Sequence, residues 1–194
     1  MKLCKLQNNI IYIIYQNIWN KMTLYDRKII RLQWYDYKKS GAYFVTFCTY
    51  DRINFFGEID NNQMALSKIW QIADTYINDI QNHYPYIRID EYIIMPNHIH
   101  IIIFIENNIN NTEIDDINSS KWSLSSIIWS YKSACTKTIN EQIKSWNINF
   151  TNSNNFWRQR RYHDHIIRND IEYQNIKNYI INNPKNRKDD KFHK

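Results

Sequence analysis

Two residue types that interrupt secondary structure are scarce in this sequence. The 194 residues include two glycines and three prolines, whereas asparagine is abundant. Asparagine tolerates the left-handed backbone conformation better than other residues that carry a side chain. Asparagine-rich segments are therefore expected to make many of the turns, above all the polar, low-complexity stretch at residues 107–122.

Cysteine is also scarce. Cys4, Cys48 and Cys135 are three scattered single residues with no CxxC spacing. This pattern argues against a disulfide framework and against a zinc site built from thiolates. The simplest location is a reducing cytoplasm, where a protein that binds DNA is associated with the nucleoid.

A clean apolar run long enough to cross a membrane is missing. Residues 1–22 combine an early positive charge with an apolar patch, as a signal peptide does, but Asn8, Asn9 and Gln16 interrupt the patch and no small-residue cleavage site follows. A membrane span needs about 18 or more apolar residues. The sequence therefore predicts an N-terminal extension at residues 1–24, a single domain at 25–194 with a basic C-terminal tail, and no membrane partner.

The overall composition is that of a folded, basic protein. A hydrophobic fraction of 43% with 15% aromatic residues excludes disorder throughout the chain. A length of 194 residues allows one substantial core and is short for two. The net charge of +6 and the pI of about 9.1 favour a polyanionic partner, with nucleic acid as the first candidate and a membrane surface as the second.

The hydrophobic pattern predicts seven main elements. They are a strand at 42–50, a helix capped by Ser67 and ended by Pro85, two strands at 86–96 and 98–106, a helix at 123–145, a strand at 156–167, and a helix capped by Asn169 or Asp170 and ended by Pro184. The two-residue connection between the second and third strands favours an antiparallel pair. This order predicts an α+β fold, close to a ferredoxin-like plan, with helices packed on an antiparallel sheet.

The segment MPNHIH, residues 95–100, places two imidazoles one residue apart in an otherwise apolar strand. Successive side chains of a strand point to opposite faces, so His98 and His100 share one face. They are either packing residues or ligands of a metal ion, and their spacing alone does not decide between the two.

A second pair of polar residues lies near the end of the last helix. Tyr179 and Asn183 are four residues apart and share a helical face. A tyrosine hydroxyl can act as a nucleophile, and an amide oxygen can complete a metal site. On spacing alone, the favoured interpretation is that Tyr179 is an aromatic residue of the core and that Asn183 ends the helix.

Several segments together resemble a known family. They are YIIMPNHIHIII at 92–103, FWRQRRYHDHIIRNDIEYQNIKNYIINNP at 156–184, the lead-in at 27–59 and the helix at 127–143. In this order they are similar to the REP-associated tyrosine transposase family, which belongs to the single-tyrosine HUH endonucleases related to small insertion-sequence transposases. The resemblance covers roughly residues 25–192. It departs in the extension, in the Asn-rich loop, and in WRQRRYHDH, where glutamine more often follows the tryptophan directly.

The resemblance implies a DNA-nicking and DNA-joining enzyme. Tyr179 is then the nucleophile that forms a 5′-phosphotyrosine, and His98, His100 and Asn183 hold a divalent ion, Mg²⁺ or Mn²⁺. Single-stranded or hairpin DNA is the expected partner, and the protein acts as a monomer or homodimer. The candidate DNA contacts are Arg31, Trp157, Arg158, Arg160, Arg161 and Arg168. His165 is a candidate for the base that helps to deprotonate the tyrosine.

Three alternatives remain open at this stage. A histidine-triad nucleotide hydrolase needs a third histidine at position 102, where this chain has Ile102. A non-catalytic DNA-binding protein derived from a transposase has no need to retain all four site residues. A metal-free fold with a basic surface is the third alternative, and metal binding is the property that separates it from the others.

Overall fold

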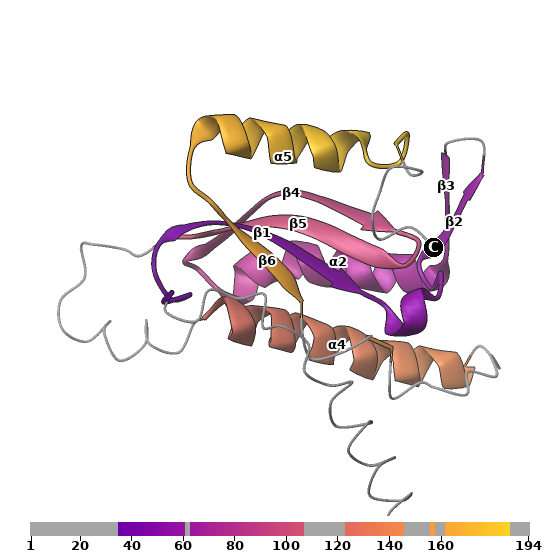
Figure 1. The fold of residues 1–194 in the computed structure, drawn as a ribbon. Helices are drawn as coiled ribbons and strands as arrows, with labels where there is room; N and C mark the ends of the chain where they lie inside the picture. The colour runs from indigo at the N-terminus through magenta and orange to yellow at the C-terminus, as the bar shows by residue number, and fades with distance from the viewer. Residues whose placement is uncertain (1–34, 61–62, 107–122, 146–155, 158–161, 187–194) are drawn as a thin grey trace, which may run out of the picture. The chain divides into compact units, whose positions relative to one another are not determined.

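The computed structural model describes residues 35–60, 63–106, 123–145, 156–157 and 162–186 (Figure 1). All of them belong to one compact unit within residues 35–194. The predicted boundary between residues 1–24 and 25–194 lies outside the described residues. In none of the described helices is there a stretch long and apolar enough to cross a membrane.

The described elements follow the predicted order and add a short 3-10 helix and a hairpin. In chain order they are β1 (Gly41–Cys48), η1 (Tyr50–Arg52), β2 (Gly57–Asp60), β3 (Gln63–Leu66), α2 (Lys68–His83), β4 (Ile87–Met95), β5 (His98–Ile105), α4 (Leu124–Ser145), β6 (His163–Ile167) and α5 (Asp170–Asn182). The predicted strand within 156–167 therefore begins later than its sequence suggested. Trp157 forms only an isolated bridge with Thr49.

The main sheet has four strands in the order β4-β5-β1-β6, and every neighbouring pair is antiparallel. Pro96 and Asn97 form the two-residue connection between β4 and β5, in which Met95 pairs with His98. β1 lies between β5 and β6, so that Thr46 faces His100 across one boundary. The predicted α+β fold with an antiparallel sheet is confirmed.

The two faces of the sheet carry different layers (Figure 1). Alternate residues of β1 and β5 pack with α2 and α4 in the main core, which includes Tyr43, Val45, Phe47, Ile99, Ile101, Ile103, Ala73, Ile77, Leu124 and Ile127. The intervening residues of the same strands face the other side, where α5 packs on β4 and β5. Because strand side chains alternate, His98 and His100 belong to this second face.

Side-chain caps fix the start of α2, on the core face of the sheet, and of α5, on the face that carries the histidines. Ser67 accepts a hydrogen bond from the backbone N–H of Trp70 and begins α2. Asn169 Oδ1 accepts from the backbone N–H of Glu172 at 2.9 Å and begins α5. Each cap satisfies a backbone donor that has no partner within the helix. The capping residues predicted from sequence are confirmed.

The β2–β3 hairpin was not predicted. Each strand has four residues, too few to show a clear alternation of polar and apolar side chains. Gly57 begins the hairpin with a φ of +135°, and a β-carbon at this position would collide with the carbonyl oxygen of Ala65. Only glycine fits this conformation and this close approach of two backbones.

Candidate active site

The two histidines of β5 lie side by side beneath α5. Their ring centroids are 4.6 Å apart, and the exposed fractions are 1% for His98 and 0% for His100. The sequence had shown only that the two side chains share one face of the strand, and the structure adds that this face is buried. Burial of two imidazoles requires that their nitrogens find partners, since an unsatisfied buried polar group costs free energy.

Hydrogen bonds orient the ring of His98. Its Nδ1 lies 2.7 Å from Oδ1 of Asn97, and Nδ2 of Asn97 donates to the carbonyl oxygen of Arg52 at 3.3 Å. The second bond fixes the amide so that Oδ1 faces the imidazole and can only accept. His98 therefore carries its proton on Nδ1, which leaves a lone pair on Nε2, the form in which a histidine binds a metal ion.

His100 links the sheet to α5. Its Nδ1 lies 2.7 Å from the hydroxyl oxygen of Thr46 on β1, and its Nε2 lies 3.2 Å from the hydroxyl oxygen of Tyr179 on α5. Thr46 is itself 2% exposed. A fixed partner on Nδ1 holds the plane of the ring, so Nε2 is presented in one direction, toward the tyrosine.

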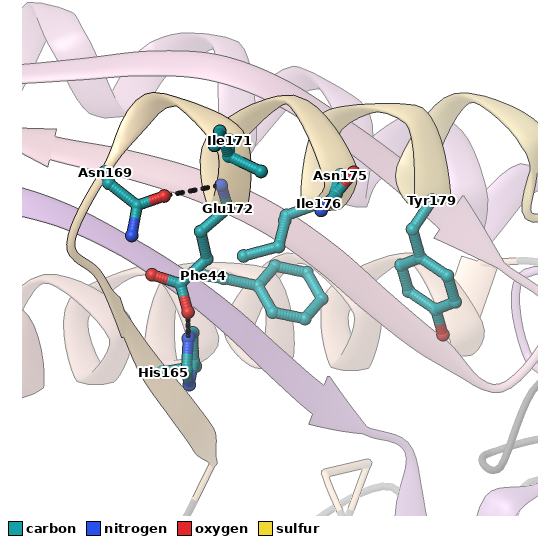
Figure 2. A pocket seen from close by; sticks show the side chains of 8 residues that line it. All are labelled: Phe44, His165, Asn169, Ile171, Glu172, Asn175, Ile176 and Tyr179. Carbon is teal, nitrogen blue, oxygen red and sulfur yellow. Dashed lines mark hydrogen bonds and ion pairs between the residues drawn. The ribbon is translucent and has the colours of Figure 1, made fainter.

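Tyr179 is positioned by packing and remains accessible. Its ring contacts Phe44 and His100 edge to face, with centroids 6.1 and 5.1 Å away. Phe44 in turn stacks on His100 at 5.4 Å. The tyrosine is 39% exposed, and its hydroxyl points from α5 toward the sheet (Figure 2). A hydroxyl that is held in place and open to solvent can meet a substrate.

Asn183 lies just over one helical turn after Tyr179, at the C-cap of α5. It is 2% exposed, and within the described part of the chain neither Oδ1 nor Nδ2 of its side chain has a hydrogen-bond partner. Buried amides are nearly always hydrogen-bonded, so this amide is placed to bind a ligand. An amide oxygen is a suitable ligand for Mg²⁺ or Mn²⁺.

The donor set at this place fits the implied divalent ion. Two imidazoles come from β5 and one amide from the end of α5. Among the described residues, no three His, Cys, Asp or Glu side chains form a cluster that could hold a metal ion. A site with only two histidines therefore depends on an amide for its third protein ligand, and Asn183 supplies a buried one.

An ionic cluster on β4 holds the middle of α5 against the sheet. Asp90 accepts hydrogen bonds from the hydroxyl of Tyr173 at 2.6 Å and from Nζ of Lys177 at 3.3 Å. It also forms an ion pair with Arg88 at 3.1 Å. Desolvation alone would raise the pKa of Asp90, but these hydrogen bonds and cations together lower it below its usual value. The cluster fixes the helix that carries the tyrosine.

A groove of about 700 Å³ runs beside Tyr179 along α5 (Figure 2). Residues that line it include Phe44, His165, Glu172, Asn175, Ile176 and Tyr179. Nε2 of His165 lies 2.6 Å from Oε1 of Glu172, and the backbone N–H of Arg168 donates to Oε2 at 2.7 Å. The bond from Arg168 and then the bond from His165 lower the pKa of Glu172. His165 thus lies in the groove of Tyr179, with a carboxylate as its immediate partner.

The candidate DNA contacts fall into three groups. Arg31, Arg158, Arg160 and Arg161 lie outside the described residues. Arg168 is exposed at the start of α5, so its side chain is available to a phosphate. Trp157 packs against Phe47, Phe56 and Phe156, and its Nε1 donates to the carbonyl oxygen of Lys132 at 3.1 Å. Its ring serves mainly core packing, and only the remaining exposed edge is open to a base.

Three residues of the site were missed by sequence reasoning. Thr46, Phe44 and Asn97 orient the histidines or pack on the tyrosine, yet none of them carries a recognisable motif. Thr46 and Phe44 reach the site because β1 pairs with β5. Asn97 could have been suspected, since it lies in the two-residue turn directly before His98.

Comparison with known proteins finds relatives of this chain. No family model matches it. A solved REP-associated tyrosine transposase bound to a REP hairpin has 20% identity and a TM-score of 0.49, over 79% of this chain and 72% of that one. A protein of Deinococcus radiodurans R1 that is provisionally assigned as a transposase has 13% identity and a TM-score of 0.38, over 78% and 95% of the two chains.

A curated relative is more similar in sequence. An uncharacterized protein of Haemophilus influenzae (strain Rd) is 32% identical over 171 residues, which cover 83% of this chain and 89% of the relative. Identity at this level over most of both chains establishes common descent. The chain therefore belongs to the same family as this Haemophilus influenzae protein.

Proposed function

We propose that this protein is a single-tyrosine HUH transposase, a metal-dependent enzyme that nicks and joins single-stranded or hairpin DNA through a 5′-phosphotyrosine intermediate. One observation carries the proposal. The accessible hydroxyl of Tyr179 lies 3.2 Å from Nε2 of His100, which belongs to a buried pair of histidines. The sequence resemblance of the HIH and NYIINNP segments to REP-associated tyrosine transposases supports the same assignment.

The proposed reaction is an exchange of phosphodiester bonds. The hydroxyl oxygen of Tyr179 attacks a phosphorus of the DNA strand and forms a tyrosine–phosphorus bond, while the bond from phosphorus to the 3′-oxygen breaks. The tyrosine gives up its proton, and the departing 3′-oxygen takes one up. The covalent link conserves the energy of the original ester. The 3′-hydroxyl of another strand end can therefore reverse the step and join strands without ATP.

The chain contributes position and orientation to this reaction. The contacts with Phe44 and His100 hold the Tyr179 ring, and the Asp90 cluster holds its helix. A fixed nucleophile reacts faster because the cost of orienting it has been met during folding. His98, His100 and Asn183 would hold the divalent ion, which when bound neutralises phosphate charge and aligns the scissile bond.

Formation of a covalent adduct tests the proposal. The purified protein is incubated with single-stranded hairpin DNA from the flanks of its own gene, with and without Mn²⁺, and then denatured and separated by electrophoresis. We expect a nicked strand and a protein–DNA adduct that depend on Mn²⁺. Tight hairpin binding with neither product would instead identify a non-catalytic DNA-binding protein.

A further inference from the structure

We propose that the groove between α5 and the β1–β6 edge of the sheet is a binding subsite for one unpaired nucleobase next to the scissile phosphate, with Asn175 reading the edge of that base. This inference rests on the proposed function, because it takes Tyr179 as the residue that meets the phosphate. The location of the groove, directly beside Tyr179, gives the first reason for this assignment.

The groove begins at the nucleophile. Tyr179 forms one end of it, and Ile176, Asn175 and Glu172 follow on the same face of α5. Ile171 of α5 and the N-cap residue Asn169 line the other end. Ten residues of helix at a rise of about 1.5 Å each give the groove a length of roughly 15 Å. A strand that places its phosphate at the tyrosine must place a neighbouring nucleotide within this distance.

The floor of the groove is aromatic. Phe44 and His165 pair directly across β1 and β6, so their side chains lie next to each other on the face that α5 covers in part. Phe44 lies between Tyr179 and the His165–Glu172 pair (Figure 2). Stacking on an aromatic ring is the usual way in which proteins hold unpaired bases, and it tolerates any base because every base has a π-face.

The wall of the groove offers apolar contact and one available amide. Ile176 and Ile171 contribute apolar surface, and Ile171 is 77% exposed. Asn175 is exposed, and its amide offers both a donor and an acceptor. Such an amide can make paired hydrogen bonds to the edge of a base, as asparagine does with adenine. The volume of about 700 Å³ lies within the range of roughly 300–1,000 Å³ that is typical of small-molecule sites.

The charge in the groove favours a base over a phosphate. Glu172 is a carboxylate with a lowered pKa, so it is ionised near neutral pH. Both of its oxygens are already engaged, one by His165 and one by the backbone of Arg168. A phosphate in direct contact with this carboxylate would be repelled, so Arg168 can meet a phosphate only outside the groove, whereas a neutral base meets no such penalty. The phosphate therefore belongs at the tyrosine end and the base belongs in the groove.

The test compares two asparagines of the same helix. Asn175→Ala removes the proposed contact, and Asn178→Ala is the matched control, since Asn178 is exposed on α5 but does not line the groove. Each variant is given a hairpin DNA with a single-stranded flank, and the same DNA with one abasic nucleotide placed in turn at each flank position. Fluorescence anisotropy measures binding, and the covalent adduct measures reaction.

The proposal predicts a specific pattern of losses. Asn175→Ala weakens binding about tenfold, and an abasic nucleotide at one position beside the cleavage site weakens binding by the parent protein about tenfold. The two losses do not add, because both remove the same contact. Asn178→Ala changes binding by less than about twofold. Asn175→Trp fills the groove and should reduce adduct formation more than Asn178→Trp does.

The outcomes separate this inference from the proposed function. The subsite is refuted if Asn175→Ala binds DNA as tightly as Asn178→Ala and no abasic position causes a loss of binding that depends on Asn175. If all variants nevertheless form the adduct, the proposed function stands. If no hairpin gives an adduct with the parent protein, the proposed function is refuted. In that case, the groove would still be a base-binding site if an abasic nucleotide weakens binding by the parent protein and Asn175→Ala removes this dependence. If no such dependence is found, the subsite and the proposed function are both refuted.

Discussion

The hydroxyl oxygen of Tyr179 and Nε2 of His100 lie 3.2 Å apart although 79 residues separate them in the chain. The contact joins α5 to β5, one of the two inner strands of the sheet, and brings a hydroxyl oxygen to a buried pair of imidazoles. It exists because β5 places His100 on the face that α5 covers, and because Tyr179 lies on the side of α5 that faces the sheet. Each of the two residues can be tested separately.

Tyr179→Phe removes one oxygen and keeps the ring, so its contacts with Phe44 and His100 are preserved. The fold, metal binding and DNA affinity should survive, while the covalent adduct and the nick disappear together. Tyr173→Phe is the comparison from the same helix: it loosens the Asp90 cluster and so lowers adduct formation, but it leaves the Tyr179 hydroxyl in place and should not abolish the adduct. Electrophoresis of the denatured reaction mixture gives the result.

An adduct formed by Tyr179→Phe would show that another residue is the nucleophile. Tyr173 and Tyr162 would then be tested next. The hydroxyl of Tyr162 lies 3.3 Å from that of Ser125 on α4, which places it away from the two histidines. Both candidates are therefore poorly positioned for a reaction that involves His98 and His100.

The two histidines should be required for binding a divalent ion. His98→Leu and His100→Leu are suitable variants, because leucine offers no metal ligand, whereas glutamine keeps an amide oxygen and alanine leaves a cavity that costs about 2 kcal/mol or more at such buried positions. We expect calorimetric titration with Mn²⁺ to show loss of the site in each variant. His163→Leu, which changes an exposed histidine of β6, should bind like the parent. If all three variants bind Mn²⁺ normally, the metal site lies elsewhere.

The protein should prefer single-stranded hairpin DNA to plain duplex, and its affinity should fall steeply with salt. The net charge of +6 favours phosphate contacts, and each contact releases counterions from the DNA. On single strands the slope of log affinity against log salt is about −0.7 per contact. Fluorescence anisotropy at several salt concentrations measures this slope. Equal affinity for duplex DNA, or binding that does not respond to salt, would contradict the proposed partner.

Local periodicity accounts for the parts of the fold that the sequence predicted. Alternation revealed β1, β4 and β5, and helical spacing revealed α2, α4 and α5, because both patterns depend on residues within a few positions of one another. The same reasoning placed His98 and His100 on one face. It could not show that this face is buried, since the covering helix lies 70 or more residues further along the chain.

Long-range pairing accounts for what was missed. Thr46 supports His100 only because β1 lies beside β5, and Phe44 meets His165 only because β1 also lies beside β6. No spacing within the sequence encodes this strand order. The Asp90–Tyr173 hydrogen bond joins residues 83 positions apart, and it could not be predicted for the same reason.

Asp90 should matter to stability through its hold on α5. Asp90→Asn loses the ion pairs with Arg88 and Lys177, and it should lower the free energy of unfolding by about 1–3 kcal/mol at pH 7. It should also reduce adduct formation. Asp79→Asn on α2 is the control, because it changes a surface pair with His83 and should have a much smaller effect. Urea unfolding measures the free energy of unfolding of both variants, and electrophoresis of the denatured reaction mixture measures the adduct.

The effect of Asp90 should depend on pH in a defined direction. Its pKa is lowered in the folded state, so the stability that it contributes is complete above the unfolded value of about 3.9 and is lost as pH falls through the folded value. The difference in stability between the parent and Asp90→Asn should therefore shrink as the medium becomes more acidic than about pH 4. A difference that stays constant down to pH 2 would mean that Asp90 acts by packing alone.

Lys132 offers a test at alkaline pH. It lies in α4, 6% exposed, with its Nζ over the rings of Phe47 and Trp157 at 5.1 and 5.5 Å. Burial lowers the pKa of Lys132 to about 8, whereas an unfolded lysine titrates near 10.4. Between these values an unfolded Lys132 binds more protons than the folded one, so the contribution of Lys132 to stability should rise with pH through this window.

Lys132→Met keeps the apolar stem and removes the charge, so it should abolish this rise. At pH 7 it should also stabilise the protein by about 1–3 kcal/mol, the cost of burying the ammonium group less the attraction of the two rings. Lys137→Met is the control, because it changes an exposed lysine of the same helix and keeps Lys132. Its pH profile should match that of the parent. Urea unfolding at pH 7, 8, 9 and 10 measures all three proteins. A difference in stability between the parent and Lys132→Met that stays constant between about pH 8 and 10 would show that the folded structure accommodates the charged lysine without penalty.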